Sequence, residues 1–352
     1  MRFYLPSAIP IFRSMVSPLL QWYDPAARNM PWRTEHPDPY CILVSEVMLQ
    51  QTRVETVKPY YERFIAELPG FASLADAGEE RLLKLWEGLG YYSRVRNLQK
   101  TAQAVMRDFG GKLPTDPALL LTLPGIGEYT AGAIASIAFG LPEPAVDGNV
   151  LRVCTRIADC HADIAEPAVR KETRELLKAV YPPGKCSEFT QSIMDLGATV
   201  CLPGEPHCLL CPLTEICLAG KNGSASVLPV KKASQLRKIE PRTVFLLRSD
   251  SGRIALRKRP DRGILAGLWE YPSESGNLNR TQAGKWLLDH GIEISRIRKS
   301  ASYKHIFTHL EWHLSGWLVS CRNEIPEFTW VTVKELNDRY SLPSAFQGFH
   351  IQ

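Results

Sequence analysis

The chain has 352 residues, of which 45% are hydrophobic and 22% charged, so two domains with cores of their own are expected. No apolar run reaches the length of a membrane span, so membrane association is not expected. The first twenty residues lack the apolar core and cleavage site of a signal peptide, which favours a cytoplasmic setting. The net charge of +5 suits a polyanionic partner without requiring one.

The first part of the chain, from Pro18 to about Cys217, has a helical pattern with little strand-like alternation. The segment 38–68 predicts one long helix, with Asp38 as its cap and Pro39 in its first turn. Further helices are predicted over 79–88, 92–109, 115–122, 128–139, 147–159, 167–180 and 185–200. We therefore expect an all-α domain over residues 1–220.

The composition changes after this point. Residues 219–242 are rich in Gly, Ser, Lys and Pro, which indicates a linker, placed at 221–240. The runs "TVFLLRS", "RIALRKR", "YKHIFTHLEWHLSGWLVS" and "FTWVTV" predict strands, and only 281–290 and 333–338 look helical between them. The chain is thus expected to be multidomain, with an α+β domain over residues 241–352.

Four cysteines lie close together in "CLPGEPHCLLCPLTEIC", over residues 201–217. Such a set can bind structural zinc or a [4Fe–4S] cluster. Zinc modules commonly use two Cys-x2-Cys pairs, whereas this segment has one, so the spacing favours iron–sulfur. His207 is interpreted as a loop residue. The predicted ligands are Cys201, Cys208, Cys211 and Cys217, and the other five cysteines, Cys41, Cys154, Cys160, Cys186 and Cys321, are interpreted as core thiols.

A glycine-rich turn, "LPGIGEYTAGAIAS" (residues 123–136), separates two predicted helices. Backbone N–H groups at Gly125 and Gly127 could hold a nucleic-acid phosphate at a helix N-terminus, as in a helix–hairpin–helix. A plain corner between two helices explains this stretch equally well. Asp147 and Asn149 begin another apolar helix in "PAVDGNVLRV", where Asp147 could simply be an N-cap.

Taken together, six ordered motifs resemble the helix–hairpin–helix DNA glycosylase superfamily and, within it, the adenine DNA glycosylase (MutY) family. The resemblance covers nearly the whole chain from about Pro18. It implies a [4Fe–4S] cofactor and a double-stranded DNA partner. The motifs are "MPWR" (30–33), "SEVMLQQT" (45–52), "GLGYYSRVRNL" (88–98), "LPGIGEYTAGAI", "VDGNVLRV" and the cysteine loop.

The resemblance assigns catalytic roles to four residues. Without the resemblance, the local sequence would place Glu46 on the solvent-facing side of a helix. The resemblance makes it the general acid that protonates adenine. Asp147 becomes either the electrostatic stabiliser of the cationic sugar or a covalent nucleophile. Tyr129 stands where the endonuclease III type has a Schiff-base lysine, which predicts base removal without strand cleavage. Asn149 is expected to hydrogen-bond within the site alongside Tyr129.

Because the adenine must leave the duplex, other side chains are expected to take its place or to contact the opposite base. By resemblance, Gln51 is a wedge, Tyr91 intercalates, and Thr52 and Leu89 touch the opposite base. Core packing is the alternative for Tyr91 and Tyr92. Arg33 is also placed in the DNA-binding set, and Arg94 and Arg96 are interpreted as phosphate contacts.

The second domain resembles the C-terminal Nudix-like domain of this family, on the stretch "RGILAGLWEYP" (262–272). The acidic helix of a hydrolytic Nudix domain is missing from "TQAGKWLLDHGIEI", so we expect binding without hydrolysis. Phe307, Thr308 and His309 match the turn that the family uses to read 8-oxoguanine. The alternative is a hairpin in which Phe307, Leu310 and Trp312 only pack.

The resulting prediction is a bilobal, bacterial cytoplasmic enzyme, active as a monomer. It excises adenine mispaired with 8-oxoguanine or guanine. A pyrimidine-excising glycosylase/lyase of the endonuclease III type is the alternative enzyme, which Tyr129 and the second domain disfavour. A non-catalytic binder of damaged DNA is the alternative outside enzymes, which the presence of both Glu46 and Asp147 disfavours.

Overall fold

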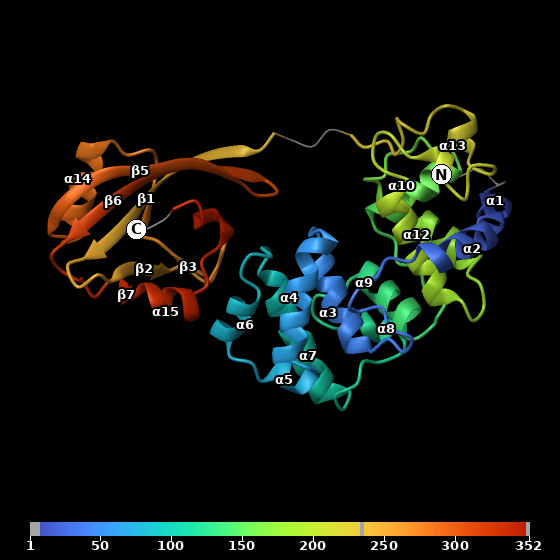
Figure 1. The fold of residues 1–352 in the computed structure, drawn as a ribbon, viewed down its shortest axis with the longest axis horizontal. Helices are drawn as coiled ribbons and strands as arrows, with labels where there is room; N and C mark the ends of the chain where they lie inside the picture. The colour runs from blue at the N-terminus through green and yellow to red at the C-terminus, as the bar shows by residue number, and fades with distance from the viewer. Residues whose placement is uncertain (1–7, 233–235, 350–352) are drawn as a thin grey trace. The chain divides into compact units, whose positions relative to one another are not determined.

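The computed structural model describes residues 8–232 and 236–349. Two compact units are present, one made of Met1–Asp76 with Arg96–Ala233 and the other of Ala77–Val95 with Ser234–Gln352. Figure 1 shows a helical first unit and a second unit built on a sheet, as expected from the sequence.

The predicted helical segments of the first unit are present, but one of them is divided, and four helices were not predicted, at Ala8–Ser14, Val16–Ala26, Phe71–Ala75 and Leu218–Lys221. The stretch 38–68 is two helices, because Gln51 adopts a left-handed φ of 59° and Arg53 is extended, so the predicted single helix is wrong. Two N-terminal helices also precede it. The bounds are α1 Ala8–Ser14, α2 Val16–Ala26, α3 Pro39–Leu49, α4 Val54–Glu67, α5 Phe71–Ala75, α7 Ser93–Asp108 (most of its length), α8 Pro117–Leu120, α9 Glu128–Ala133 with a π-helical turn Ile134–Ala138, α10 Gly148–Ile157, α11 Pro167–Lys178, α12 Cys186–Thr199, a 3₁₀ turn Cys208–Leu210 and α13 Leu218–Lys221.

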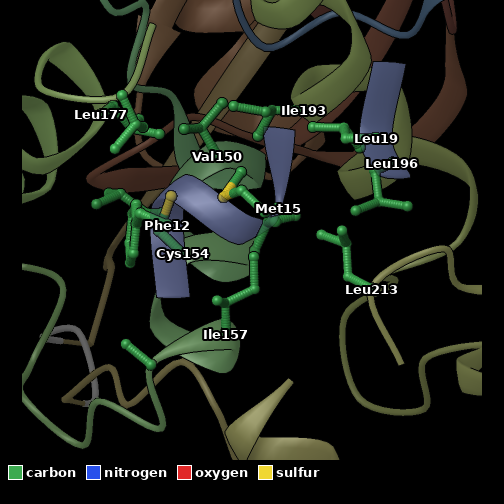
Figure 2. Packing of buried hydrophobic residues seen from close by; sticks show 14 of the residues in the cluster. Phe12, Met15, Leu19, Val150, Cys154, Ile157, Leu177, Ile193, Leu196 and Leu213 are labelled. Carbon is green, nitrogen blue, oxygen red and sulfur yellow. The ribbon is translucent and has the colours of Figure 1, made fainter. Parts of the chain in front are cut away.

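One apolar core of this unit holds α10 in place. Figure 2 shows Phe12 of α1, Leu19 of α2, Val150 of α10 and Ile193 of α12 pointing into a common interior, together with Leu213 of the cysteine loop. The N-terminal helices, α10, α12 and the cysteine loop therefore share one apolar core. As predicted, Asp38 caps α3, accepting a hydrogen bond from the Tyr40 amide at 2.7 Å.

The second unit is built on a mixed seven-stranded sheet with the strand order β3-β2-β1-β6-β5, to which β4 and β7 add on β1 and β2. The predicted strand runs are all present, while the short strands β3 and β4 and the first half of β5 were not predicted. The bounds are α6 Glu79–Leu85, β1 Lys238–Ser249, β2 Ile254–Lys258, β3 Trp269–Glu270, β4 Ser273–Ser275, α14 Arg280–Asp289, β5 Ile294–Ile306, β6 Leu310–Cys321, β7 Thr329–Val331, α15 Val333–Asp338 and a 3₁₀ turn Ser344–Phe346.

The central strand β1 is buried on both sides and pairs in parallel with β6 and antiparallel with β2. Alternate side chains point to opposite faces of a strand. Val244 packs with Leu336 of α15 on one face, and Phe245 packs with Leu287 of α14 on the other. The continuous apolar run of β1 is thus explained by a sheet covered on both faces.

Candidate functional site

The glycine-rich turn joins α8 to α9 and is set by a close approach of two backbone segments. Gly125 has a φ of 77°, and a Cβ there would lie 2.6 Å from the Cβ of Asn97. In α9, a Cβ on Gly132 would lie 2.3 Å from the Pro144 carbonyl oxygen. Gly132 therefore lets α9 lie directly against the segment that leads to Asp147, and Gly125 lets the turn approach Asn97 of α7.

Glu46 lies in the middle of α3 and is buried, with only 5% of its surface exposed. The Tyr129 hydroxyl of α9 donates a hydrogen bond to its Oε2 atom at 2.6 Å. Burial raises the pKa of Glu46 to about 7; the nearby Asp147 also raises it, while the Tyr129 hydrogen bond and Arg33 oppose the shift. Near neutral pH this carboxyl group can therefore both hold and release a proton.

Asp147 is the N-cap of α10. Its Oδ1 accepts a hydrogen bond from the Val150 amide at 2.7 Å, and its Oδ2 accepts one from the Asn149 side-chain amide at 2.9 Å. Burial raises the pKa of Asp147, and these hydrogen bonds and Arg152 act against that shift. Asp147 therefore caps α10, as the sequence allowed, and its carboxylate lies at the positive end of the helix dipole.

These groups share one cavity of about 710 Å³ in the first unit, within the size range of ligand sites. The predicted residues Glu46, Thr52, Tyr129, Asp147 and Asn149 all line it. Gln51 is not in this lining; it lies beside it, exposed, at the left-handed turn between α3 and α4.

Asp195 was not predicted from the sequence, and it holds two arginines that line the cavity. Its side chain is 1% exposed and accepts hydrogen bonds from both guanidinium groups of Arg28 and Arg33. Arg33, predicted to bind DNA, lines the cavity with both Nη atoms held within 2.9 Å of Asp195. The one sequence feature that could have pointed to Asp195 is that it is a single acidic residue inside the apolar run "SIMDLGATV".

The predicted reader of the opposite base lies in the second unit. Tyr91 has a φ of 45° and is 47% exposed, and its hydroxyl lies 3.1 Å from the Thr308 hydroxyl. Thr308 and His309 are exposed in the turn between β5 and β6, whereas Phe307 packs on Trp312 with a centroid distance of 4.9 Å. The hairpin thus combines a packed aromatic side chain with two exposed polar ones.

Two neighbours of Tyr91 are internal. Leu89 is buried, and Tyr92, also buried, has its hydroxyl 3.2 Å from the Ser341 hydroxyl. Arg94 was interpreted as a phosphate contact, and that interpretation is wrong. Its buried Nη2 donates to the carbonyls of Leu89 and Gly90 at 2.9 and 3.1 Å, because the turn leaves these oxygens without helical partners.

A second cavity of the first unit, of about 560 Å³, is lined by Cys201, Cys208, Cys211 and Cys217 together with Arg156. Within residues 8–232 and 236–349, no three cysteine, histidine or carboxylate side chains lie close enough to hold a single metal ion. Burial raises the pKa of the Cys211 thiol to about 11. His207 is exposed in this loop, and Cys154, Cys160, Cys186 and Cys321 are buried while Cys41 is partly buried.

Comparison with known proteins connects both units to DNA repair. Residues 44–179 match the HhH-GPD superfamily base excision DNA repair protein family, and residues 243–351 match the NUDIX domain family. The adenine DNA glycosylase of Mus musculus is 35% identical over 88% of this chain and 71% of that protein. That of Buchnera aphidicola subsp. Schizaphis graminum is 32% identical over 94% of this chain and 95% of that protein.

The chain belongs to the adenine DNA glycosylase family. The family is a group of base excision repair hydrolases that act on N-glycosyl bonds. The helical part also resembles a thermostable thymine-DNA glycosylase, at 29% identity and a TM-score of 0.54, covering 61% of this chain and 99% of that one. A trapped endonuclease III–DNA covalent intermediate is 26% identical with a TM-score of 0.51 over 60% of this chain and 98% of that one.

Those two structures resemble only the helical part, so the fold of that part is common to glycosylases with different target bases. The family assignment comes from relatives that match both units. In the part of the chain that the structure describes, no helix is long and apolar enough to cross a membrane.

Proposed function

We propose that this enzyme hydrolyses the N-glycosidic bond of adenine mispaired with 8-oxoguanine or guanine in duplex DNA, without cleaving the strand. The observation that carries the proposal is the buried Glu46, hydrogen-bonded to Tyr129 at 2.6 Å in the cavity that Asp147 also lines. Two carboxyl groups in different environments are what acid-assisted departure of a base requires.

Glu46 is proposed to donate the proton that makes adenine a leaving group. A carboxyl group with a pKa of about 7 is substantially protonated at physiological pH. When it protonates an adenine ring nitrogen, the bond between the sugar and the base breaks and its electron pair leaves with the base. Water then adds to the sugar and returns a proton to the site, so adenine and an abasic site are the products.

Asp147 is proposed to remain ionised and to stabilise the cationic sugar. Hydrogen bonds from Val150 and Asn149 and the N-terminus of α10 all favour its charged form. The same geometry suits a carboxylate that bonds to the sugar transiently as a nucleophile. Electrostatic stabilisation and transient bonding by Asp147 give the same products. Asn149 fixes the orientation of the carboxylate in either case.

Tyr129 is proposed to position Glu46 and to leave the enzyme without lyase activity. A tyrosine hydroxyl cannot form a Schiff base with the sugar aldehyde, so strand cleavage through an imine is not available at this position. This distinguishes the proposal from an endonuclease III type activity, which the resemblance of the helical part alone would equally allow.

Recognition of the mispair is proposed to use both units. Gln51, at the turn after α3, would wedge into the space left by the flipped adenine, and Thr52 and Leu89 would contact the opposite base. Tyr91 and Thr308, whose hydroxyls lie 3.1 Å apart, would face the opposite base together with Phe307 and His309. Gly125 and Gly127 would hold a DNA phosphate with their amides.

The four-cysteine cavity is proposed to hold a [4Fe–4S] cluster. Four thiols line a cavity of about 560 Å³, and their spacing, with a single Cys-x2-Cys pair, favours a multi-iron centre over a single zinc. When bound, the cluster would supply a rigid, redox-active crosslink among Cys201, Cys208, Cys211 and Cys217. The expectations of a monomer and of a bacterial cytoplasmic setting stay predictions.

The test is a single-turnover incubation with an end-labelled duplex carrying adenine opposite 8-oxoguanine, with each time point run with and without hot alkali. Breaks that appear only after alkali support base removal without lyase chemistry. Equal breaks without alkali would indicate a lyase. No breaks in either sample, with binding retained, would indicate a non-catalytic damage binder. Parallel duplexes with guanine or thymine opposite adenine define the preference.

A further inference from the structure

One buried cation of the first unit takes no part in the proposed chemistry. Arg156, near the end of α10, is 1% exposed and is among the largest fully buried side chains of the described residues. Burying a guanidinium group costs several kcal/mol unless an anion or a full set of hydrogen-bond acceptors compensates for the lost water. Its surroundings should therefore contain that compensation.

The polar contacts of the Arg156 side chain are carbonyl oxygens and one sulfur. Nη1 donates to Leu202 at 2.7 Å and to the Sγ atom of Cys201 at 3.3 Å, and Nε donates to Leu228 at 3.0 Å. Nη2 lies 3.5 Å from the Gly204 carbonyl oxygen. None of the ion pairs formed by the described residues joins Arg156 to a carboxylate. Carbonyls satisfy its hydrogen bonds, but they do not neutralise its charge.

A second cation increases the demand for negative charge. Arg152 lies one turn earlier on α10, and its Nε donates to the Cys201 carbonyl at 2.7 Å. Two arginines four residues apart on one helix repel each other, and this repulsion is strongest in a buried setting. Asp147 offsets part of the charge of Arg152.

A cluster held in the four-cysteine cavity, which Arg156 itself lines, would supply the missing negative charge. Glu205 and Glu215 also line this cavity, but both are exposed to water. Neutral thiols would leave the guanidinium uncompensated. Four thiolates outweigh the positive charge of an iron–sulfur core, so a cluster in this cavity is an anion as a whole.

We propose that Arg156 is the buried counter-charge of the iron–sulfur centre and that its hydrogen bond to the Cys201 sulfur raises the reduction potential of that centre. The inference rests on the proposed [4Fe–4S] cofactor. Reduction adds negative charge to the cluster and its sulfurs, so a cation and a donor beside Cys201 favour the reduced form more than the oxidised one. The same contact retains the cluster, because losing it would leave the cation alone in the core.

The test compares the purified, cluster-loaded full-length chain with two substitutions. Arg156→Met keeps the volume and removes the charge and every donor, while Arg156→Lys keeps the charge and loses most of the donors. We expect Arg156→Met to shift the potential measured by protein-film voltammetry to more negative values. We also expect it to release iron to a chelator about 10- to 100-fold faster, as for other residues that support metal ligands. The potential and the rate of iron release of Arg156→Lys should lie between those of the unsubstituted protein and those of Arg156→Met.

Arg94→Met is the matched control, since Arg94 is also buried and donates to the carbonyls of Leu89 and Gly90. The reduction potential of Arg94→Met should equal that of the unsubstituted protein. An unchanged potential and unchanged iron release in both Arg156 variants would overturn the proposal. If Arg156→Met does not fold, Arg156→Lys decides by the same readouts. Purified protein that contains zinc and no iron would instead overturn the cofactor proposal on which this one rests.

Discussion

The proposed catalytic cavity and the proposed reader turn of the second unit, Phe307 to His309 with Tyr91, are built in opposite ways. Glu46 is buried and Asp147 is partly buried, and each carboxyl group is already hydrogen-bonded to protein, as the Tyr129 and Asn149 contacts illustrate. At the reader turn, Tyr91 and Thr308 are exposed and share one hydrogen bond. Preorganised buried groups act strongly on a transition state, while exposed hydrogen bonds exchange with water at little net gain. Substitutions in the cavity should therefore change rates greatly, and substitutions at the turn should change selectivity slightly.

Replacing the acid should have the largest effect. Glu46→Gln keeps the shape and the contact with Tyr129 but has no proton to give, so we expect the single-turnover rate of adenine removal to fall about 10³-fold. The exposed helical substitution Glu62→Gln on α4 serves as the control and should retain the full rate. Full activity in Glu46→Gln would remove Glu46 from the proposed mechanism.

A second cavity substitution separates charge from capping. Asparagine is as good an N-cap as aspartate, so Asp147→Asn should leave the free energy of unfolding within about 1 kcal/mol. The lost negative charge should lower the single-turnover rate about 10²- to 10³-fold. Asp116→Asn makes the same change at the N-cap of α8, where Asp116 accepts from the Ala118 amide at 2.8 Å, and should affect neither property. Equal losses of stability and rate in Asp147→Asn would indicate a structural role only.

The burial of Glu46 also predicts a pH dependence of stability. Its pKa is raised from 4.5 to about 7, so the folded protein binds this proton more tightly than the unfolded chain. The resulting stabilisation is fully present below about pH 4.5 and is lost as the pH rises through about 7. Glu46→Gln should therefore gain stability relative to the unsubstituted protein, by up to about 3 kcal/mol between pH 4.5 and 8. Chemical denaturation at both pH values measures this, and a constant difference would contradict it.

The reader turn should give the smallest change. Thr308→Ala removes one exposed hydroxyl, so the preference for 8-oxoguanine over guanine opposite adenine should fall about fivefold, which corresponds to a hydrogen bond of about 1 kcal/mol. The rate at saturating enzyme should stay the same with the preferred duplex. Thr281→Ala on α14, also exposed, is the control. A loss of catalytic rate comparable to that of Glu46→Gln would end the distinction between the two regions.

Much of the fold could be predicted from sequence because its signals are local. Asp38 before Pro39 marked a helix start, and the apolar run of β1 marked a strand. The break between α3 and α4 was missed because Gln51 carries no turn signature, although it adopts a left-handed conformation. The strands β3 and β4 have two and three residues, too few to show a period of two.

The candidate site was predicted from motifs, and what was missed depends on contacts distant in sequence. Asp195 lies 162 residues from Arg33, and no local pattern announces their ion pair. The role of Arg94 was predicted wrongly because the local sequence around an arginine is the same whether its side chain binds a DNA phosphate or a backbone carbonyl. The burial of Glu46 was likewise visible only once α9 and α10 were packed around it.

The parallel pairing of β1 with β6 has a consequence for how the molecule forms. The pairing runs from Lys238 with Leu310 to Ser249 with Cys321, so strand partners are about seventy residues apart along the chain. Closing so large a loop is slow compared with forming neighbouring helices. During synthesis the sheet cannot close until Cys321 has left the ribosome, by which time the chain of the helical unit, which ends at Ala233, is already available to fold. We therefore expect the unit with the cysteine loop to fold first, while the unit with the sheet is still a growing chain.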